Sequence, residues 1–409
     1  MSLSLACFSQ ADDNVFIYRK GSVYSIMLAH TNLAFAKAIE EAFVKMPIPD
    51  KYNDHNLGKK VFYTQNKDLK IKDLKKHEGF IVNTNSDKDQ MNDIDFLLQK
   101  QFVASRMLAK WFNRDKNSGV CNMDLIQKRG YDNVSNLDRR LAALSVRKEA
   151  LLMDAGEELI GSTFILINDI RYLDKSSASG IAGGIVNATV NVYNATQGDY
   201  SFDSNDLGDM IKTLKGFNVK IDTYLYQLVW DELAEGLFYN SVYTEKTDEV
   251  KKTNFEKLRG DFSLVYIGKQ ESSGKTCSFL GISEDEPELM VLKACQRAFD
   301  ENVANLQKNF EVFKIKSPLL STDPIQCEIG LKEGVTPDSK FEVLEVVEDG
   351  NGHVSYRRKG VIKPAKGQIW DNRFMAVEEG AENAEIGFTT FTKVSGGGFY
   401  PGMLVREIK

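Results

Sequence analysis

The closest approach to a chemical motif is Gly268-Lys-Gln-Glu-Ser-Ser-Gly274-Lys275-Thr276, which nearly spells a nucleotide-binding P-loop. A P-loop has four residues between its glycines, so that successive backbone N–H groups surround the phosphates, and here there are five. It also needs a helix whose N-terminus faces the anion, whereas Cys277-Ser-Phe-Leu-Gly281 has the pattern of a strand. We therefore predict that residues 268–276 form the turn of a β-hairpin.

The cysteine and histidine side chains are spaced too widely to indicate a metal or redox site. The cysteines include no C-x-x-C pair, and the histidines show no H-x-H or H-x-x-x-H spacing. We expect every histidine to be a surface or loop residue and no disulfide framework. The residues concerned are Cys7, Cys121, Cys277, Cys295, Cys327, His30, His55, His77 and His353.

The sequence shows no coherent set of residues for acid–base catalysis, for nucleophilic catalysis or for dinucleotide binding. The acidic pairs are far apart in the sequence, and each lies in a segment predicted to be a helix or loop, where carboxylates are usually solvated. No Gly-x-Ser-x-Gly motif occurs, and the glycines at 180, 183 and 184 lack the strand–turn–helix unit of a dinucleotide fingerprint. The sequence therefore predicts no catalytic, cofactor-binding or metal-ligating residue and no cofactor. The acidic pairs are Glu157-Glu158, Asp285-Glu286 and Glu378-Glu379.

Composition limits the class of protein. The chain has 409 residues, of which 42% are hydrophobic and 27% charged, a globular balance, and its length predicts about two or three domains. Its formal net charge is −6 without a basic block, which argues against general nucleic-acid binding. No apolar run reaches the roughly 18 residues of a transmembrane helix.

The N-terminus resembles the end of an export signal. Ser9-Gln10-Ala11 has the small-x-small form of a signal-peptidase site and is followed by two aspartates. A basic segment is missing and the apolar stretch 3–8 is short, so we interpret residues 1–11 as a truncated signal, with an accidental match as the alternative. Lipidation of Cys7 is a further alternative.

Apolar periodicity divides the chain into helices and strands. Helical spacing occurs at 33–43, 102–112, 136–160 and 292–313, and strand-like runs at 60–64, 123–130, 163–172 and 217–230. We expect 231–236 to be a turn and 237–243 a returning strand, while the glycine-rich stretch 174–216 is an insertion or a long excursion. The 163–172 run is apolar enough for a strand buried on both faces.

The C-terminal part has a different character. Pro318 and Pro324 predict a linker, after which strand-like runs alternate with turns at 341–347, 354–362, 368–370, 388–394 and 403–408. The sequence therefore predicts an α+β protein: a layered α/β domain over 12–316 and a small antiparallel β-barrel or sandwich over 317–409.

This order of elements resembles a family of bacterial envelope domains. The long helix ends in Glu157-Glu158-Leu159-Ile160, the buried strand is Phe164–Ile170, and the next hairpin turns at Trp230-Asp-Glu-Leu-Ala-Glu-Gly236 before a last long helix over 289–313. Over roughly residues 60–409 the order is similar to that of the curli-secretion lipoprotein and a flagellar assembly protein, both related to the TolB N-terminal domain. The resemblance implies a non-enzymatic assembly protein; pore formation belongs to the curli protein alone and is not carried over.

These observations give one leading functional expectation and two rivals. We expect an exported protein of the periplasm or outer membrane that binds other proteins or its own copies, with peripheral membrane association and a cytoplasmic location left open. The first rival is a ligand-binding protein or hydrolase that uses a cleft between the two domains. The second is a nucleotide-binding protein that uses 268–276.

Overall fold

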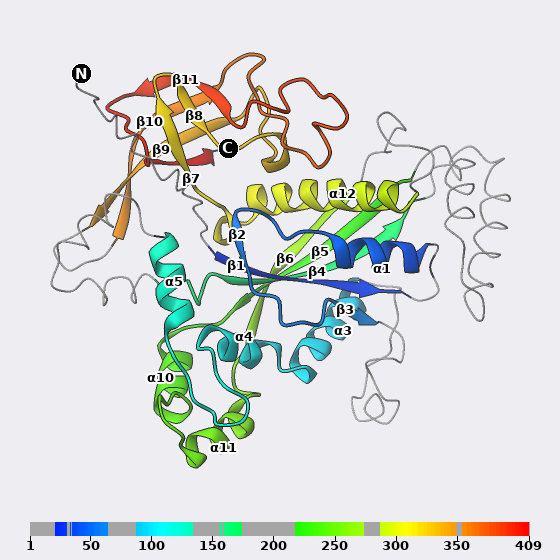
Figure 1. Cartoon of the computed structure of the whole chain (residues 1–409), viewed down its shortest axis with the longest axis vertical. Helices are drawn as coiled ribbons and strands as arrows, with labels where there is room; N and C mark the ends of the chain where they lie inside the picture. The colour runs from blue at the N-terminus through cyan, green and yellow to red at the C-terminus, as the bar shows by residue number, and fades with distance from the viewer. Residues whose placement is uncertain are drawn as a thin grey trace, which may run out of the picture.

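The structure is a computed structural model that describes residues 21–30, 33, 35–63, 87–133, 156–157, 159–173, 217–273, 287–348 and 354–408. They form a sheet with helices on both faces, which we call the sheet region, and a closed β-barrel (Figure 1). The predicted α+β class is confirmed. Of the two predicted forms of the C-terminal part, a barrel or a sandwich, the structure has the barrel. Several predictions fall outside the described residues: the export signal, the 174–216 excursion and all but the end of the 136–160 helix.

The sheet is mixed, with parallel strands on one side and antiparallel strands on the other. Its order is β2-β1-β4-β5-β6, and β3 also pairs with β1. β1 runs parallel to β2, β3 and β4, whereas β5 is antiparallel to both β4 and β6. The strands are β1 (Gly21–Ala29), β2 (Tyr52–Asp54), β3 (Val61–Tyr63), β4 (Thr163–Tyr172), β5 (Val219–Leu228) and β6 (Leu264–Ser273). The predicted strand runs 163–172 and 217–230 therefore lie next to each other in one sheet, as β4 and β5.

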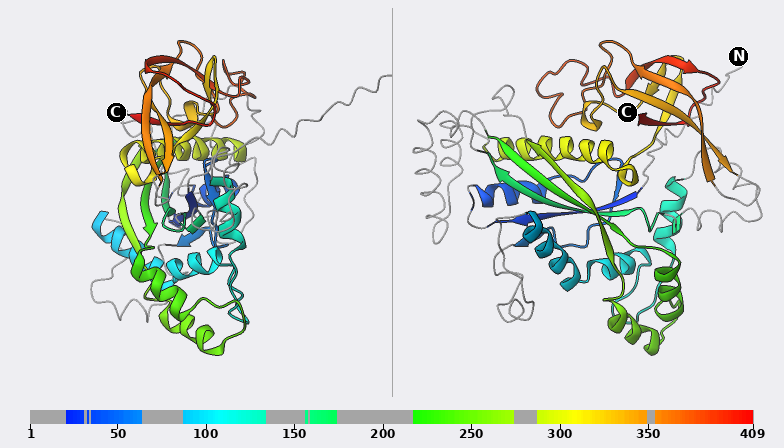
Figure 2. Two further views of the ribbon diagram at one scale, coloured as in Figure 1. Left: turned by 90° about the vertical axis from the view of Figure 1, so that its left-hand side faces the viewer. Right: turned by 180° about the vertical axis from the view of Figure 1, so that it is seen from behind.

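Helices cover both faces of this sheet, as the views in Figure 2 show. One apolar cluster joins the sheet to α1 (Ala36–Lys45) and α12 (Pro287–Asn309). The other joins it to α3 (Asp87–Lys100), α4 (Val103–Trp111), α5 (Asp124–Asn133), α10 (Glu232–Ser241) and α11 (Glu249–Leu258). Because strand side chains alternate, Leu166 enters the first cluster and Ile167 the second, so the apolar run of β4 is buried on both faces as predicted.

α12 separates the sheet from the barrel and uses a different stripe for each (Figure 1). The predicted apolar stripe, including Cys295, Phe299 and Leu306, is buried against the sheet. A second stripe at 293, 297, 300, 304 and 308 is mostly polar and meets the barrel side. The helix therefore acts as a shared layer, as its 3.6-residue periodicity allows.

The barrel closes in the order β10-β11-β8-β7-β12-β9 around its own apolar cluster, and all its strand pairs are antiparallel. The strands are β7 (Ser317–Thr322), β8 (Ile325–Cys327), β9 (Lys340–Glu348), β10 (Val354–Pro364), β11 (Thr389–Gly396) and β12 (Leu404–Ile408), with 3-10 turns η2 (Glu311–Phe313) and η3 (Leu331–Glu333). The predicted linker is wrong, because Pro318 lies in β7 and Pro324 in the turn before β8. Residues 368–370 contribute only an isolated bridge from Trp370 to Gly330 instead of a strand.

Two predicted strands are helices. The 123–130 run lies in α5, whose first turn is capped by Asn122 Oδ1 accepting from the Asp124 N–H at 3.1 Å. The expected hairpin at 231–243 is α10, where the Asp231 carboxylate accepts from the Ala234 N–H at 2.9 Å. In both segments a side-chain cap satisfies an otherwise unpaired helix N–H, and tertiary packing outweighs strand propensity.

Candidate functional site

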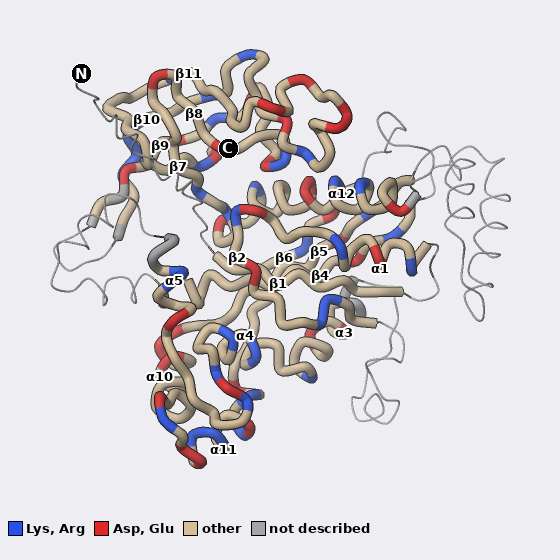
Figure 3. Tube along the Cα trace, in the orientation of Figure 1, with Lys and Arg blue, Asp and Glu red and all other residues tan. Residues whose placement is uncertain are grey.

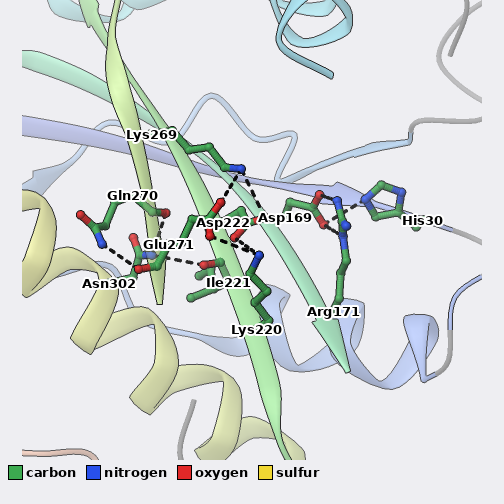
Figure 4. Close-up of polar contacts among 10 residues, drawn as sticks. All are labelled: His30, Asp169, Arg171, Lys220, Ile221, Asp222, Lys269, Gln270, Glu271 and Asn302. Carbon is green, nitrogen blue, oxygen red and sulfur yellow. Dashed lines mark hydrogen bonds and ion pairs between the residues drawn. The ribbon is translucent and has the colours of Figure 1, made fainter. Parts of the chain in front are cut away.

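Three acidic side chains form a row across neighbouring strands near the end of the sheet where β1 and β4 finish (Figure 4). Asp169 of β4 lies directly opposite Asp222 of β5, and Asp222 lies opposite Glu271 of β6. Residues opposite one another share a face of the sheet, and like charges in that position repel. The row therefore needs opposing groups: Arg171, Lys220 and Lys269 supply positive charge and His30 contributes a hydrogen bond. We call the whole group the charged row.

Asp169 is held by His30 and Arg171. Arg171 Nε donates to Asp169 Oδ1 at 2.8 Å, Arg171 Nη2 donates to Oδ2, and His30 Nε2 lies 2.9 Å from Oδ1. Burial of the Asp169 carboxylate opposes its ionisation, but the hydrogen bonds from His30 and Arg171 outweigh it and lower the pKa of Asp169 to about 2. The carboxylate is thus a fixed anion.

Asp222 and Glu271 share two lysines in a closed ring of ion pairs. Lys220 Nζ lies 3.2 Å from Asp222 and 3.4 Å from Glu271, and Lys269 Nζ lies 3.6 Å from Asp222 and 2.8 Å from Glu271. Asp222 Oδ1 has no hydrogen bond of good geometry, so its contact with Lys220 is an ion pair only. The hydrogen bond from Lys269 is the largest cause lowering the pKa of Glu271.

The charged row can fasten the end of the sheet, because each carboxylate is opposed by a cation. On the opposite face Asn302 of α12 donates to the backbone oxygens of Gln270 and Ile221, which ties this helix to the same two strands (Figure 4). Within the described ranges no group of three or more His, Cys, Asp or Glu side chains could hold a metal ion. Along the described trace, acidic and basic residues are interspersed (Figure 3).

A groove of about 500 Å³ lies beside β6, the strand at one edge of the sheet in the part of the chain that the structure describes. β5 and β6 form one wall and α3 and α4 the other. Asp95 accepts a hydrogen bond from Tyr226 Oη at 2.6 Å, and the Arg259 guanidinium lies 4.0 Å from the centre of the Phe102 ring. The apolar and aromatic lining residues are Leu98, Phe102, Val103, Ala104, Tyr226, Phe262, Leu264 and Tyr266. The groove thus combines four aromatic side chains with two charged groups whose positions are already fixed.

The P-loop-like segment does not line this groove as a phosphate loop. Gly268 to Ser273 belong to β6, so the predicted hairpin turn is wrong for these residues, and 274–276 lie outside the described residues. A Cβ on Gly268 would come within 2.3 Å of the Phe310 ring. Glycine is needed there because an aromatic ring packs on the strand.

Two histidines expected at the surface are buried. His30 belongs to the charged row, and His55 lies between Met107 and Arg129. Arginine has only donors, so His55 Nδ1 accepts from Arg129 at 2.9 Å and Nε2–H donates to the Met107 oxygen at 3.0 Å. Burial and then the charge of Arg129 lower the pKa of His55 well below its usual value. His77 and His353 lie outside the described residues.

The remaining sequence candidates are scattered. Cys121, Cys295 and Cys327 are buried. Glu157 accepts from Tyr239 Oη at 2.6 Å near α10, whereas Glu379 pairs with α12 from a barrel loop. The acidic pairs therefore do not converge in the described part of the chain. The sequence analysis did not predict the charged row. The two polar residues Asn168 and Asp169 within an otherwise apolar strand could have indicated it, because a buried acid needs partners.

A second cleft, of about 330 Å³, lies where the barrel meets the segment before β2. Its walls include Trp370 and Arg373 from the barrel side and Asp50 and Lys51 from the sheet region. Lys332 Nζ, from η3, lies 2.7 Å from Asp50 Oδ2 and so bridges the two parts.

Comparison with known proteins adds no relative: neither the family models nor the curated proteins include a match to this chain. No helix among the described residues is long and apolar enough to span a membrane.

Proposed function

We propose that the protein is a non-enzymatic, exported component of the bacterial cell envelope that binds other proteins during assembly. The small-x-small site at Ser9 to Ala11 supports export. The buried strand β4, its partner β5 and the long helix α12 keep the order on which the resemblance to the TolB N-terminal-like group rests, although the segment 230–236 leads into helix α10 instead of forming a hairpin turn. The single observation that carries the binding role is the aromatic groove beside β6.

An extended segment of a partner polypeptide fits this groove better than a compact ligand. Leu264 and Tyr266 line the groove, and Val265, whose side chain alternates to the opposite face, is 45% exposed. A strand added along β6 would cover apolar surface on both faces at once and would pair with the backbone of the outer strand. The partner would place large apolar side chains at alternate positions.

The pairing segment would be short. β6 has a bulge at Ile267, where the register with β5 shifts, and beyond the bulge come Lys269 and Glu271 of the charged row. Bulges and charges are features that limit edge-to-edge pairing. They confine the proposed contact to about residues 262–266.

Site-specific photo-crosslinking in the native host tests this role. A photo-reactive residue at Val265 should form crosslinks to a partner protein, and Leu264→Arg should abolish them because a charge would enter the apolar groove. The same reactive residue at Val394, an exposed position of the barrel (51% exposed), is the matched control. Equal crosslinking at both positions would contradict the binding role, and crosslinks to this chain itself would identify the partner as a second copy.

Export has its own test, independent of the groove. Fractionation of the native host, using the full-length gene product with any upstream extension, should place the protein in the periplasm or with the outer membrane. Recovery from the cytoplasm alone would remove the envelope assignment.

The ligand-binding or hydrolase rival is favoured by the 330 Å³ cleft, which Asp50, Trp370 and Arg373 help to line. A binding screen followed by melting curves would support it if Trp370→Ala removed the shift given by a hit. Hits that stabilise the variant equally would count against this cleft.

A further inference from the structure

The stripe of α12 that faces the barrel is held by ionic and polar contacts. Arg297 Nη2 donates to the Phe374 oxygen at 2.9 Å and to Glu379 at 2.5 Å, and Lys293 also pairs with Glu379. About three to four turns further along, Lys308 Nζ donates to the Gly334 oxygen, just after η3, at 2.7 Å. Asp300 lies on the same stripe between these two attachments.

Asp300 is an acid buried without enough donors. It is 6% exposed, and Gln296 Nε2 donates to its Oδ1 at 2.9 Å, but no donor among the described residues reaches Oδ2. Gln296 Oε1, from the preceding turn, is also buried without a donor from the described part of the chain. A buried acceptor without a donor costs about 1–3 kcal/mol, and a charged one costs more.

The charges that face Asp300 come from two segments. Lys332 and Glu333 belong to η3 of the barrel, and Asp50 precedes β2 of the sheet region. Lys332 already pairs with Asp50, and Glu333 adds a second negative charge near Asp300. The donor that this arrangement lacks is supplied most simply by a proton.

We propose that Asp300 is a proton-linked latch, which holds η3 of the barrel on α12 while it is protonated and favours opening of this contact when it ionises. Protonation removes the charge from the buried carboxyl and turns Oδ2 from an acceptor without a donor into a donor. Ionisation leaves a buried anion whose nearest opposing charge, Lys332, is already paired with Asp50. The latch regulates the seating of the barrel and is independent of the groove beside β6.

The sign of the pH dependence follows from burial. Burial raises the pKa of Asp300 from 3.8 to about 7, against the opposing charge of Lys332. In an open state, with Asp300 in water, the pKa returns to its ordinary value. The contact is therefore most stable below the ordinary pKa and weakens as pH rises toward 7, so the opening constant should grow about tenfold per pH unit and level off above 7.

Hydrogen exchange of the whole chain at pH 5.5, 6.5, 7.5 and 8.5 tests the latch. After correction for intrinsic exchange, opening of peptides over 296–304 and 331–335 should increase about tenfold from pH 5.5 to 6.5 and change little above 7.5. Asp300→Asn should remove this dependence, because its amide does not titrate. Glu301→Gln, the exposed neighbour on α12, is the matched control and should behave as wild type.

Two outcomes would overturn the proposal. One is a parallel pH dependence of opening in wild type and Asp300→Asn. The other, which needs no variant, is a carbon-13 NMR titration of the Asp300 carboxyl in the wild-type protein with a midpoint below pH 5 instead of near 7.

Discussion

At the scale of single residues, the chemistry of this protein lies in how charges are neutralised inside it. Asp169 illustrates this, because its carboxylate is buried yet ionised by virtue of His30 and Arg171. Removing one partner of such a buried ionic group leaves the others uncompensated, at a cost of about 3–5 kcal/mol. Arg171 is two positions from Asp169, but His30 is far away in the sequence. The sequence could therefore show that Asn168 and Asp169 are polar residues within an apolar run, but not that Asp169 forms a buried ion pair.

We predict that Asp169→Asn lowers the free energy of unfolding by about 3 kcal/mol at pH 7, measured in urea. The native pKa of about 2 is below the ordinary 3.8, so the stabilisation is complete above pH 3.8 and is lost as pH falls toward 2. The difference between wild type and variant should narrow over that range. Asp338→Asn, at an exposed acid, should change stability by less than about 0.5 kcal/mol; an equal loss in the two variants would refute the role given to the ion pairs.

At the scale of elements, periodicity predicted the long or strongly patterned segments and failed for short ones. β4 and α12 were readable because burial on two faces, or on one helical stripe, fixes the spacing of apolar residues. The helix α10 could not be predicted in this way, because its aromatic residues have strand propensity. The Asp231 cap and the stacking of Phe238 on Phe112, with ring centres 4.3 Å apart, favour a helix instead. β1 was also missed, because its mixture of small, polar and apolar residues acquires meaning only between β2 and β4.

Two glycine substitutions separate packing from backbone effects. We predict that Gly268→Ala destabilises the protein by about 1–3 kcal/mol, because the methyl group would overlap the Phe310 ring. Gly236→Ala is the matched control: its nearest neighbouring atom is 4.0 Å away and it lies inside α10, so alanine should stabilise by about 0.5–1 kcal/mol. Thermal melting distinguishes them by opposite shifts in Tm, and a neutral Gly268→Ala would mean that the close contact is not maintained.

At the scale of the whole molecule, α12 couples the sheet region to the barrel. Lys293 is fully buried, and the acid that pairs with it, Glu379, comes from a barrel loop. This ion pair therefore spans the two parts, together with Arg297. The prolines predicted a linker between independent units. In the structure the barrel strand β7 follows α12 and η2 after only a few residues.

We predict that Glu379→Ala destabilises the protein by about 3 kcal/mol, because it leaves buried Lys293 without this carboxylate. The loss should appear first as faster limited proteolysis between the sheet region and the barrel, around residues 310–317. Glu378→Ala, at the exposed neighbouring acid, provides the comparison. Identical cleavage rates for the two variants would show that this ion pair does not hold the barrel.

The sequence by itself determined the α+β class, the doubly buried β4, the apolar stripe of α12 and the C-terminal run of antiparallel strands, because these depend on local periodicity and turn chemistry. Only the tertiary structure decided the strand order, the closure of the barrel, the charged row, the groove beside β6 and the burial of Asp300. Each of these arises from residues tens to hundreds of positions apart, whose charges and apolar surfaces become neighbours only when the strands are in register, and no local pattern encodes that proximity.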